Sequence, residues 1–489
     1  MYIGIDLGTT GVKVLLVDGR GNLLNSVTET YELLTPRPLW TEQNPGDWYE
    51  SALRAIRKCI AGHETEIKAL SFSGQMHGLV ILDEADRIIR PALLWNDQRT
   101  ISETDSLNRE IGIENLLEET GNIALTGFTA PKILWVKNNE PENYRKIRKI
   151  MLPKDYLAYR FTGNFVSDVS DISGSLLFDV KNKTYSRKML DFLGIDSGML
   201  PKVLESKEVA GMLTEKVRGK LGIPQPVKVI VGGGDQAIGA VGTGTVSGGD
   251  INISLGTSGV VFVATDAYAA DRKSFLHSFA HANGKYHLMG VTLAAAGSLK
   301  WWKESFRPEK SYDEIFSDLI KTESDDTLYY LPYIFGERSP VNNPLAKGTF
   351  SGFCATHGPE HFSRAVVEGV TFSLRHCYEA IKNLNIESKQ IRITGGGAKN
   401  DHWCQMVADV FNIAVQRPAI TEGSSFGAAI MAMVGDGLFP DVQEACADLV
   451  RVEKEFLPIA ENVRIYEKKY RNYLRLYKNI EPFFEMIRE

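Results

Sequence analysis

The sequence is poor in cysteine and lacks the patterns that cysteine and histidine form at redox or metal sites. Five cysteines are scattered over 489 residues without Cys-x-x-Cys spacing. A disulfide framework is therefore not expected, and reduced thiols in a cytoplasmic protein are the natural interpretation. His277 and His281 are four residues apart in the sequence, but their surroundings are typical of a strand. A protein-built metal cage is therefore not predicted.

Long apolar runs, a basic excess and a P-loop are also missing. No run reaches the ~18 apolar residues of a membrane-spanning helix, and no basic region precedes an apolar run at the N-terminus, so neither a membrane span nor secretion is expected. The 55 basic and 61 acidic side chains give a net charge of −6, which argues against nucleic acid as a partner. The pattern Gly-x-x-x-x-Gly-Lys-Ser/Thr does not occur, which excludes a P-loop mechanism.

The length and one internal repeat predict two domains. A chain of 489 residues exceeds what one hydrophobic core normally supports. Residues 2–18 resemble a β-hairpin with a Gly-Thr turn, and residues 253–266 repeat Leu-Gly-Thr-Thr/Ser-Gly-Val about half a chain later. We therefore expect two similarly built domains, residues 1–246 and 247–489, facing each other.

The turns of these two hairpins are candidate phosphate-binding loops. Glycines and hydroxyl-bearing residues leave backbone N–H groups uncovered, which suits a polyphosphate. The candidate nucleotide contacts are Gly8, Thr9, Thr10 and Lys13 in the first hairpin and Gly256 and Thr257 in the second. Either turn could equally be a plain connection. Asp6 ends its strand just before the first turn, where it could hold Mg²⁺, whereas Leu255 takes its place in the second.

Residues 227–239 read as a strand, three glycines and a helix start, with Asp235 at the mouth of the turn. We interpret Asp235 as the catalytic base of a sugar kinase and as a second candidate Mg²⁺ contact. A structural turn with Asp as helix cap is the simple alternative. The pattern Gly232-x-Gly234-x-x-Ala237 also matches a dinucleotide fingerprint, which would indicate an oxidoreductase. Asp235 argues against that, since its charge would repel a pyrophosphate at the helix N-terminus.

A second triple-glycine turn, in residues 391–400, has Ala398 where the first has Asp235. Losing the acid suits an anionic ligand, so Gly396, Gly397, Ala398 and Asn400 are predicted to contact the nucleotide. The small residues from Ser424 to Ala429 predict a close-packed helix behind that site. A structural glycine turn is the alternative.

Two polar loops in the first half are candidate sugar-binding segments. One exposes Gln75, Met76 and His77, and the other offers Trp95, Asn96 and Asp97. Amide, carboxylate, imidazole and indole groups bind the hydroxyls and faces of sugars. For His77 and Trp95 a purely structural role is an equal alternative. At the other end of the chain, Tyr466, Tyr470, Tyr473 and Tyr477 have helical spacing, which predicts a helix docked on its own domain.

Taken together, these motifs resemble the FGGY family of carbohydrate kinases nearly end to end. Residues 127–139 and residues 348–368 match the two signatures of the family. The resemblance implies an α/β fold of two actin-like, ribonuclease H-like ATPase domains related by duplication, with the active site in the cleft between them.

The resemblance also implies base catalysis by Asp235, sugar contacts at Met76 and His77, and ATP with Mg²⁺ at the Gly-Thr turns and the Gly396-Gly397 loop. Residues 73–78, 94–97, 152–157 and 336–340 are most similar to members that phosphorylate D-xylulose. Ribulose, fructose, glycerol or a pentitol is the nearest alternative substrate. A non-catalytic actin-like ATPase is a more distant alternative. Association into a homodimer is left open.

Overall fold

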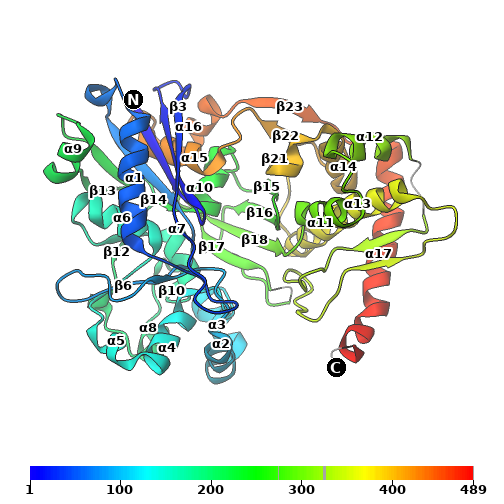
Figure 1. Ribbon diagram of the computed structural model, residues 1–489, viewed down its shortest axis with the longest axis horizontal. Coiled ribbons are helices and arrows are strands. Elements are labelled where there is room, and N and C mark those ends of the chain that lie inside the picture. Colours follow the sequence, from blue (N-terminus) through cyan, green and yellow to red (C-terminus); the bar gives the residue numbers. More distant parts are fainter. Residues whose placement is uncertain (274, 323–325, 488–489) are drawn as a thin grey trace.

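The computed structural model describes residues 1–273, 275–322 and 326–487, and it has two lobes, each built around one mixed sheet (Figure 1). The strands of the first sheet are β1 (Tyr2–Leu7), β2 (Gly11–Val17), β3 (Leu23–Thr30), β5 (Ala69–Gly74), β13 (Val209–Met212) and β14 (Lys228–Gly234). Those of the second are β15 (Asp250–Leu255), β16 (Gly259–Thr265), β17 (His277–Ala280), β18 (Tyr286–Thr292), β21 (Gln390–Thr394), β22 (Val415–Pro418) and β23 (Val452–Phe456).

The two sheets repeat one topology. In the first lobe, β1 pairs antiparallel with β2 and parallel with β5, which pairs parallel with β14. In the second lobe, β15 pairs antiparallel with β16 and parallel with β21, which pairs parallel with β22. The first Gly-Thr turn joins β1 to β2, and the second joins β15 to β16. The duplication predicted from those turns is confirmed.

The strand order corrects one equivalence that the sequence suggested. Strand β21, which leads into Gly395–Gly397, lies next to β15, as β5 lies next to β1. The counterpart of β14, which leads to Asp235, is β22. Ala398 is therefore not the counterpart of Asp235. The second triple-glycine turn is instead equivalent to the loop that carries Met76 and His77.

Helices cover both sheets and fill the space between the lobes (Figure 1). Those of the first lobe are α1 (Pro45–Cys59), α2 (Ile101–Leu107), α3 (Ile113–Thr120), α4 (Thr129–Asn139), α5 (Pro141–Lys146), α6 (Pro153–Thr162), α7 (Val169–Ile172), α8 (Arg187–Leu193), α9 (Glu215–Leu221) and α10 (Asp235–Gly242). The later ones are α11 (Ala296–Phe306), α12 (Tyr312–Lys321), α13 (Pro359–Lys382), α14 (Asp401–Phe411), α15 (Gly423–Asp436), α16 (Val442–Leu449) and α17 (Ala460–Met486). Among the described residues, no helix combines the length and the apolar character needed to cross a bilayer.

The C-terminal helix α17 runs along the outer side of the second lobe (Figure 1, red). Tyr466, Tyr470 and Tyr473 are buried in the main core of that lobe. The hydroxyl groups of Tyr473 and Tyr333 form a hydrogen bond of 2.9 Å there. The predicted docking of this helix on its own domain is confirmed.

Helices α10 and α15 pack against each other at the centre of the molecule, and α15 also covers β1, β5 and β14 of the first sheet. Phe426 and Ile430 share a core with Tyr2 and Leu15 of the first lobe. The prediction that residues 424–429 lie behind the second glycine turn is therefore wrong, because their small side chains serve the contact with the first lobe. The division of the chain at residues 246 and 247 stays a prediction.

Glycines make this helix contact possible. A Cβ on Gly427 of α15 would lie 1.9 Å from the carbonyl oxygen of Ile238, and one on Gly242 would lie 1.9 Å from the carbonyl oxygen of Gly423. Backbone atoms cannot move aside as a flexible side chain can, so the helices approach this closely only without a Cβ at these positions.

We expect Gly427→Ala to lower the free energy of unfolding by about 1–3 kcal/mol, because the added methyl group forces the two helices apart. Gly239→Ala is the matched control on α10, since its Cβ meets only the Ser424 hydroxyl at 3.3 Å. Denaturant unfolding of both variants measures the difference. Equal stability of the two variants would show that the helices can separate without cost.

Candidate functional site

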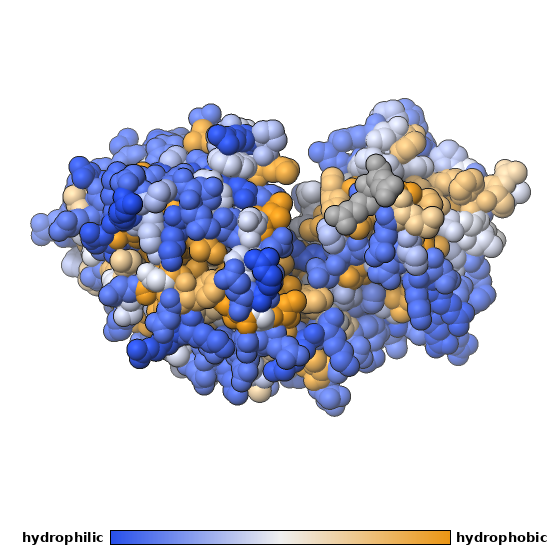
Figure 2. All heavy atoms as spheres, turned by 90° about the horizontal axis from the view of Figure 1, so that it is seen from below, coloured by the Kyte–Doolittle hydropathy of each residue, from blue (hydrophilic) through white to orange (hydrophobic). Residues whose placement is uncertain are grey.

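Two cavities lie at the strand ends that carry the candidate residues. Figure 2 shows a notch in the surface between the two halves of the molecule. In each sheet the strand ends bring the candidate residues to one edge, since Leu7 pairs with Gly74, Gly74 with Gly234, and Ser254 with Thr394. The large cavity, of about 760 Å³, belongs to the second lobe. The small cavity, of about 130 Å³, is lined by both lobes.

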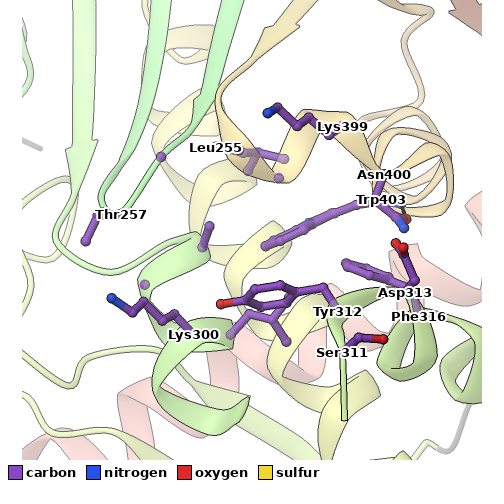
Figure 3. A pocket seen from close by; sticks show the side chains of 16 residues that line it. Leu255, Thr257, Lys300, Ser311, Tyr312, Asp313, Phe316, Lys399, Asn400 and Trp403 are labelled. Atoms are coloured by element: carbon purple, nitrogen blue, oxygen red, sulfur yellow. Dashed lines mark hydrogen bonds between the residues drawn. The ribbon is translucent and has the colours of Figure 1, made fainter. Parts of the chain in front are cut away.

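The large cavity has the size and lining of a nucleotide site. The rings of Tyr312, Phe316 and Trp403 gather in it, and Thr257 with Lys300 lies at the opposite end from Asp313 and Asn400 (Figure 3). A flat apolar wall beside a polar end suits a base and a phosphate tail.

Two of the predicted glycines shape this cavity. Gly396 borders open space, with no atom within 4 Å of the position its Cβ would take. A Cβ on Gly397 would come within 2.9 Å of Leu255 and 3.0 Å of Trp403. The glycine loop therefore keeps the cavity open on one side and allows close packing on the other.

The turn at residues 256–258 is fixed by the start of α11. The carbonyl oxygen of Thr257 accepts hydrogen bonds from the N–H groups of Ala295 and Gly297, at 2.8 and 3.1 Å, and that of Gly256 accepts from Ala296 at 2.9 Å. Within the described residues, the N–H groups of the turn itself have no hydrogen-bond partner. These N–H groups are therefore available to a phosphate group.

The small cavity has the composition of a polyol site. From the first lobe it is lined by Met76, His77, Trp95, Leu125, Gly127, Phe128, Asp235 and Gln236, and from the second by Ser258, Val260, His277, Met289, Val291 and Arg338. Its volume of about 130 Å³ equals that of about four water molecules at ~30 Å³ each, so it suits one small, hydrogen-bonding ligand. Thr257 lines the large cavity and Ser258 the small one, so a single turn separates them.

His77 is held as a neutral imidazole with one lone pair to offer. Its Nδ1 lies 2.6 Å from the carbonyl oxygen of Gly174, so this nitrogen carries the proton and donates it. Burial, together with the charge of Lys132, lowers the pKa of His77 to about 3. The remaining ring nitrogen is therefore an acceptor for a ligand hydroxyl. His77 takes a left-handed backbone conformation, φ 68°, and Lys132 donates to its carbonyl oxygen at 2.9 Å.

Asp235 is the first residue of α10. Burial, with a further contribution from the negative charge of Asp6, raises the pKa of Asp235 to about 7. A carboxylate with such a pKa suits a general base near neutral pH. The three glycines before it each make room for a neighbour that a Cβ would strike: Phe72 O at 1.9 Å from 232, Ser170 Oγ at 2.3 Å from 233 and Met76 Cγ at 2.9 Å from 234.

A buried charge cluster supports the strand that leads to Asp235. The ammonium group of Lys154 is 2.6 Å from Asp155 and 2.9 Å from Asp168. Burial would lower the pKa of Lys154, but the neighbouring carboxylates outweigh it and raise the pKa. Asp168 accepts from Ser170 Oγ at 2.5 Å, and that hydroxyl in turn accepts from Gly234 N at 3.2 Å. The cluster thus fixes the backbone just before Asp235.

Several predicted sugar contacts lie outside the small cavity. Asp97 is fully buried, with its carboxylate 2.7 Å from the Arg99 guanidinium and from Thr41 N. Asn96 accepts from the Thr41 hydroxyl at 2.7 Å, and Gln75 donates to Gln43 at 3.1 Å. These three side chains hold the loops in place instead of lining the cavity. Trp95 does line it, and its indole donates to Thr9 Oγ1 at 3.0 Å.

Only some of the predicted nucleotide contacts line the large cavity. Gly256, Thr257, Gly396, Gly397 and Asn400 line the large cavity, and Asn400 also caps α14. Ala398 is buried beside it, with its carbonyl oxygen bonded to Arg417 at 3.1 Å.

The first Gly-Thr turn, with Gly8, Thr9 and Thr10, borders neither cavity. Lys13 lies opposite Asp6 in the β1–β2 pairing and 4.0 Å from Glu422. The predicted clamp of two turns on one phosphate tail stays a prediction.

Sequence reasoning missed the residues that enter the large cavity from α11 and α12, and those that enter the small cavity from the second lobe. They are Ala296, Gly297, Leu299, Lys300, Ser311, Tyr312, Asp313 and Phe316 in the first case and His277, Met289 and Arg338 in the second. Gly297 could have signalled its role, because its Cβ would lie 2.7 Å from Thr257 O. Arg338 lies in the segment of residues 336–340 that the family resemblance had marked, and the other missed residues follow no local motif.

The dinucleotide interpretation of residues 232–237 is wrong on topology. Such a motif needs a parallel strand that returns beside the first strand after the helix. Here α10 is followed by β15, which belongs to the other sheet.

Comparison with known proteins agrees with this geometry. Models of the N-terminal and C-terminal domains of the FGGY family of carbohydrate kinases match residues 1–242 and 251–435. The xylulose kinase of Lactococcus lactis is 40% identical over 484 residues, covering 98% of this chain and 96% of its own. That of Escherichia coli is 38% identical over 485 residues, covering 99% of both chains.

The crystal structure of a xyloylose kinase from Brucella ovis is 33% identical, matches with a TM-score of 0.94 and covers 99% of both chains. Sequence, fold and the arrangement of the two cavities therefore lead to one conclusion: the chain belongs to the FGGY family of carbohydrate kinases.

Proposed function

We propose that this kinase transfers the γ-phosphoryl group of ATP to the terminal hydroxyl of D-xylulose, giving D-xylulose 5-phosphate and ADP. The observation that carries the proposal is the single turn, residues 256–258, that separates a nucleotide-sized cavity from a polyol-sized cavity containing Asp235. The choice of D-xylulose rests on the xylulose kinases of L. lactis and E. coli, which match this chain nearly end to end.

In this mechanism Asp235 accepts the proton of the sugar hydroxyl while its oxygen attacks the γ-phosphorus. The bond between the γ-phosphorus and the β–γ bridging oxygen breaks, and that oxygen leaves with ADP. The unpaired N–H groups of residues 256–258 donate to the phosphate oxygens and stabilise their charge. His77 accepts a hydrogen bond from another sugar hydroxyl, which orients the substrate.

A magnesium ion fits beside these carboxylates. Asp6 has a buried oxygen, Oδ1, without a hydrogen-bond partner, and its charge raises the pKa of Asp235. A cation held by these carboxylates would offset the repulsion between their charges and would give Asp6 Oδ1 a partner. In the described part of the chain, no three His, Cys, Asp or Glu side chains form a metal site. That agrees with Mg²⁺, which typically takes one or two carboxylates and completes its shell with water and phosphate. It would neutralise charge on the phosphates.

The location and the assembly of the protein are proposed on the same basis. A cytoplasmic location and assembly as a homodimer stay predictions. Another ketose or a polyol is the alternative substrate, because one methylene more or less changes binding by only about 1–3 kcal/mol.

An ADP-coupled assay over D-xylulose, D-ribulose, D-fructose, glycerol and D-arabinitol tests the substrate. We expect the highest kcat/KM with D-xylulose. A higher value for any other member would contradict the proposed substrate, and ATP hydrolysis without sugar stimulation would contradict kinase activity itself.

Asp235→Asn should lower kcat by about 10²–10⁴-fold, because the amide keeps the size of the side chain but cannot take the proton. Calorimetric titration with ATP should give an unchanged affinity, since Asp235 lies outside the large cavity. Asp105→Asn, at an exposed carboxylate of α2, is the control. Wild-type turnover in Asp235→Asn would remove this residue from its role.

Gly396→Val should weaken ATP binding with little loss of stability. The position has open space around it, so the protein tolerates the side chain, but that space is the large cavity. We expect KM for ATP to rise at least tenfold while KM for the sugar changes little. Gly219→Val, equally open but distant from both cavities, is the control. An unchanged KM for ATP would place the nucleotide elsewhere.

A further inference from the structure

Arg338 is a cation in the wall of the small cavity to which the mechanism above gives no role. It belongs to the segment between β19 (Tyr329–Leu331) and β20 (Thr349–Ser351) of the second lobe. Among the described residues, its guanidinium group has no hydrogen-bond or ion-pair partner. The side chain is half-buried, and a charge partly shielded from water is stabilised when a ligand supplies a hydrogen-bond partner.

The backbone around Arg338 is anchored on both sides. The carboxylate of Glu337 accepts from Arg338 N at 2.7 Å and from Leu293 N at 2.9 Å. On the other side, Ser339 N donates to the carbonyl oxygen of Val291 at 3.0 Å. Val291 itself lines the cavity. The arginine side chain is therefore presented from a fixed point and not from a loose loop.

The nearest carboxylate does not neutralise Arg338. Glu337 attracts the guanidinium group, but it forms no ion pair with it and is already bonded to the two backbone N–H groups. Burial raises the pKa of Glu337 to about 7, which reduces its charge near neutral pH.

Arg338 and Asp235 enter the small cavity from different lobes. Burial is the main cause of the low pKa values of His77 and His277, and the charge of Arg338 lowers both further. Asp235 is the first residue of α10 in the first lobe, whereas Arg338 enters from the second lobe, where Ser339 is bonded to Val291 of β18. A ligand whose hydroxyl meets Asp235 would therefore bring its opposite end to Arg338.

Arg338 complements two acceptors of the small cavity. Asp235 and the free nitrogen of His77 are both acceptors, which suit hydroxyl groups. Toward the end remote from the phosphorylated hydroxyl, D-xylulose has a carbonyl group at C2, beside its terminal hydroxymethyl group, and a carbonyl oxygen can only accept. A guanidinium group offers several N–H donors in one plane.

We propose that Arg338 is a specificity-determining residue that donates hydrogen bonds to the carbonyl oxygen of the ketose at the end remote from Asp235. The inference rests on the proposed function and deepens it. It makes the second lobe a direct contact of the sugar, so that sugar and nucleotide are both held by residues of that lobe. An alcohol oxygen in the same place needs Arg338 less, because a hydroxyl group can donate as well as accept, whereas a carbonyl oxygen can only accept.

The test compares kcat/KM for D-xylulose and for D-arabinitol, its reduced analogue, in the wild type, Arg338→Met and Arg338→Lys. We expect Arg338→Met to lower kcat/KM for D-xylulose by about 10- to 100-fold, the effect of losing a hydrogen bond from a charged donor. The loss with D-arabinitol should be clearly smaller, so the ratio of the two values falls. Arg338→Lys should recover part of the ratio. Arg57→Met, at an exposed position of α1, is the matched control.

A ratio that stays at the wild-type value in Arg338→Met would overturn the assignment, as would an equal loss for both substrates. Arg338→Lys serves as the test protein if the methionine variant does not fold, with a smaller fall of the same ratio expected. Failure of the proposed function gives a different result, because the wild type would then favour another sugar. If that sugar has no carbonyl group, the Arg338 assignment fails with it. If that sugar is a ketose, the ratio of kcat/KM for the ketose to kcat/KM for its own reduced alcohol tests the Arg338 assignment in the same way.

Discussion

The close contact between α10 and α15 determines where Asp235 lies relative to the second lobe. The two helices meet backbone to backbone at Gly242 and Gly427, and Asp235 is the first residue of α10. The hydroxyl group of Ser424 on α15 donates to the carbonyl oxygen of Asp235 at 3.4 Å. The helix pair therefore fixes Asp235, the proposed base that follows β14 of the first sheet, relative to the turn that borders the large cavity in the second lobe. In the proposed mechanism, the glycines at this crossing set the distance between Asp235 and the second lobe.

A second constraint separates the two ligands. In the turn at residues 256–258, the carbonyl groups of Gly256 and Thr257 accept hydrogen bonds from the start of α11, and the N–H groups have no partner among the residues that the structure describes. Since Thr257 faces one cavity and Ser258 the other, the phosphate tail and the sugar hydroxyl would meet across one or two residues of backbone. Phosphoryl transfer depends mainly on such positioning and on charge stabilisation, so a rigid turn of this kind is well suited to it.

The sequence was sufficient for the features that depend on local backbone chemistry. The two Gly-Thr hairpins, the duplication and the glycine turn before Asp235 were all predicted, because each requires particular residues at fixed spacing. Features that depend on tertiary partners were not. Asp97 had the chemistry of a sugar ligand, but Arg99 and Thr41 occupy its carboxylate. The small residues of α15 were assigned to the wrong lobe, since a pattern of alanine and glycine shows close packing but not the partner.

Strand order could not be read from the motifs either. Two triple-glycine turns invited the equivalence of Ala398 with Asp235, but hydrogen bonding places β21 in the position of β5. The corrected equivalence is informative, because it pairs the loop of Met76 and His77 with the loop of Gly396 and Gly397. The duplicated fold thus uses the same strand end in each lobe, once beside the small cavity and once beside the large one.

The central claim is that a sugar hydroxyl meets Asp235 while the triphosphate lies against residues 256–258. A crystal structure with D-xylulose and a non-hydrolysable ATP analogue tests it most directly. The account predicts the terminal hydroxyl within about 2.6–3.2 Å of the Asp235 carboxylate and the γ-phosphate bonded to the N–H groups of the turn. A sugar bound outside the small cavity, or a hydroxyl that faces away from Asp235 in the closed complex, would contradict it.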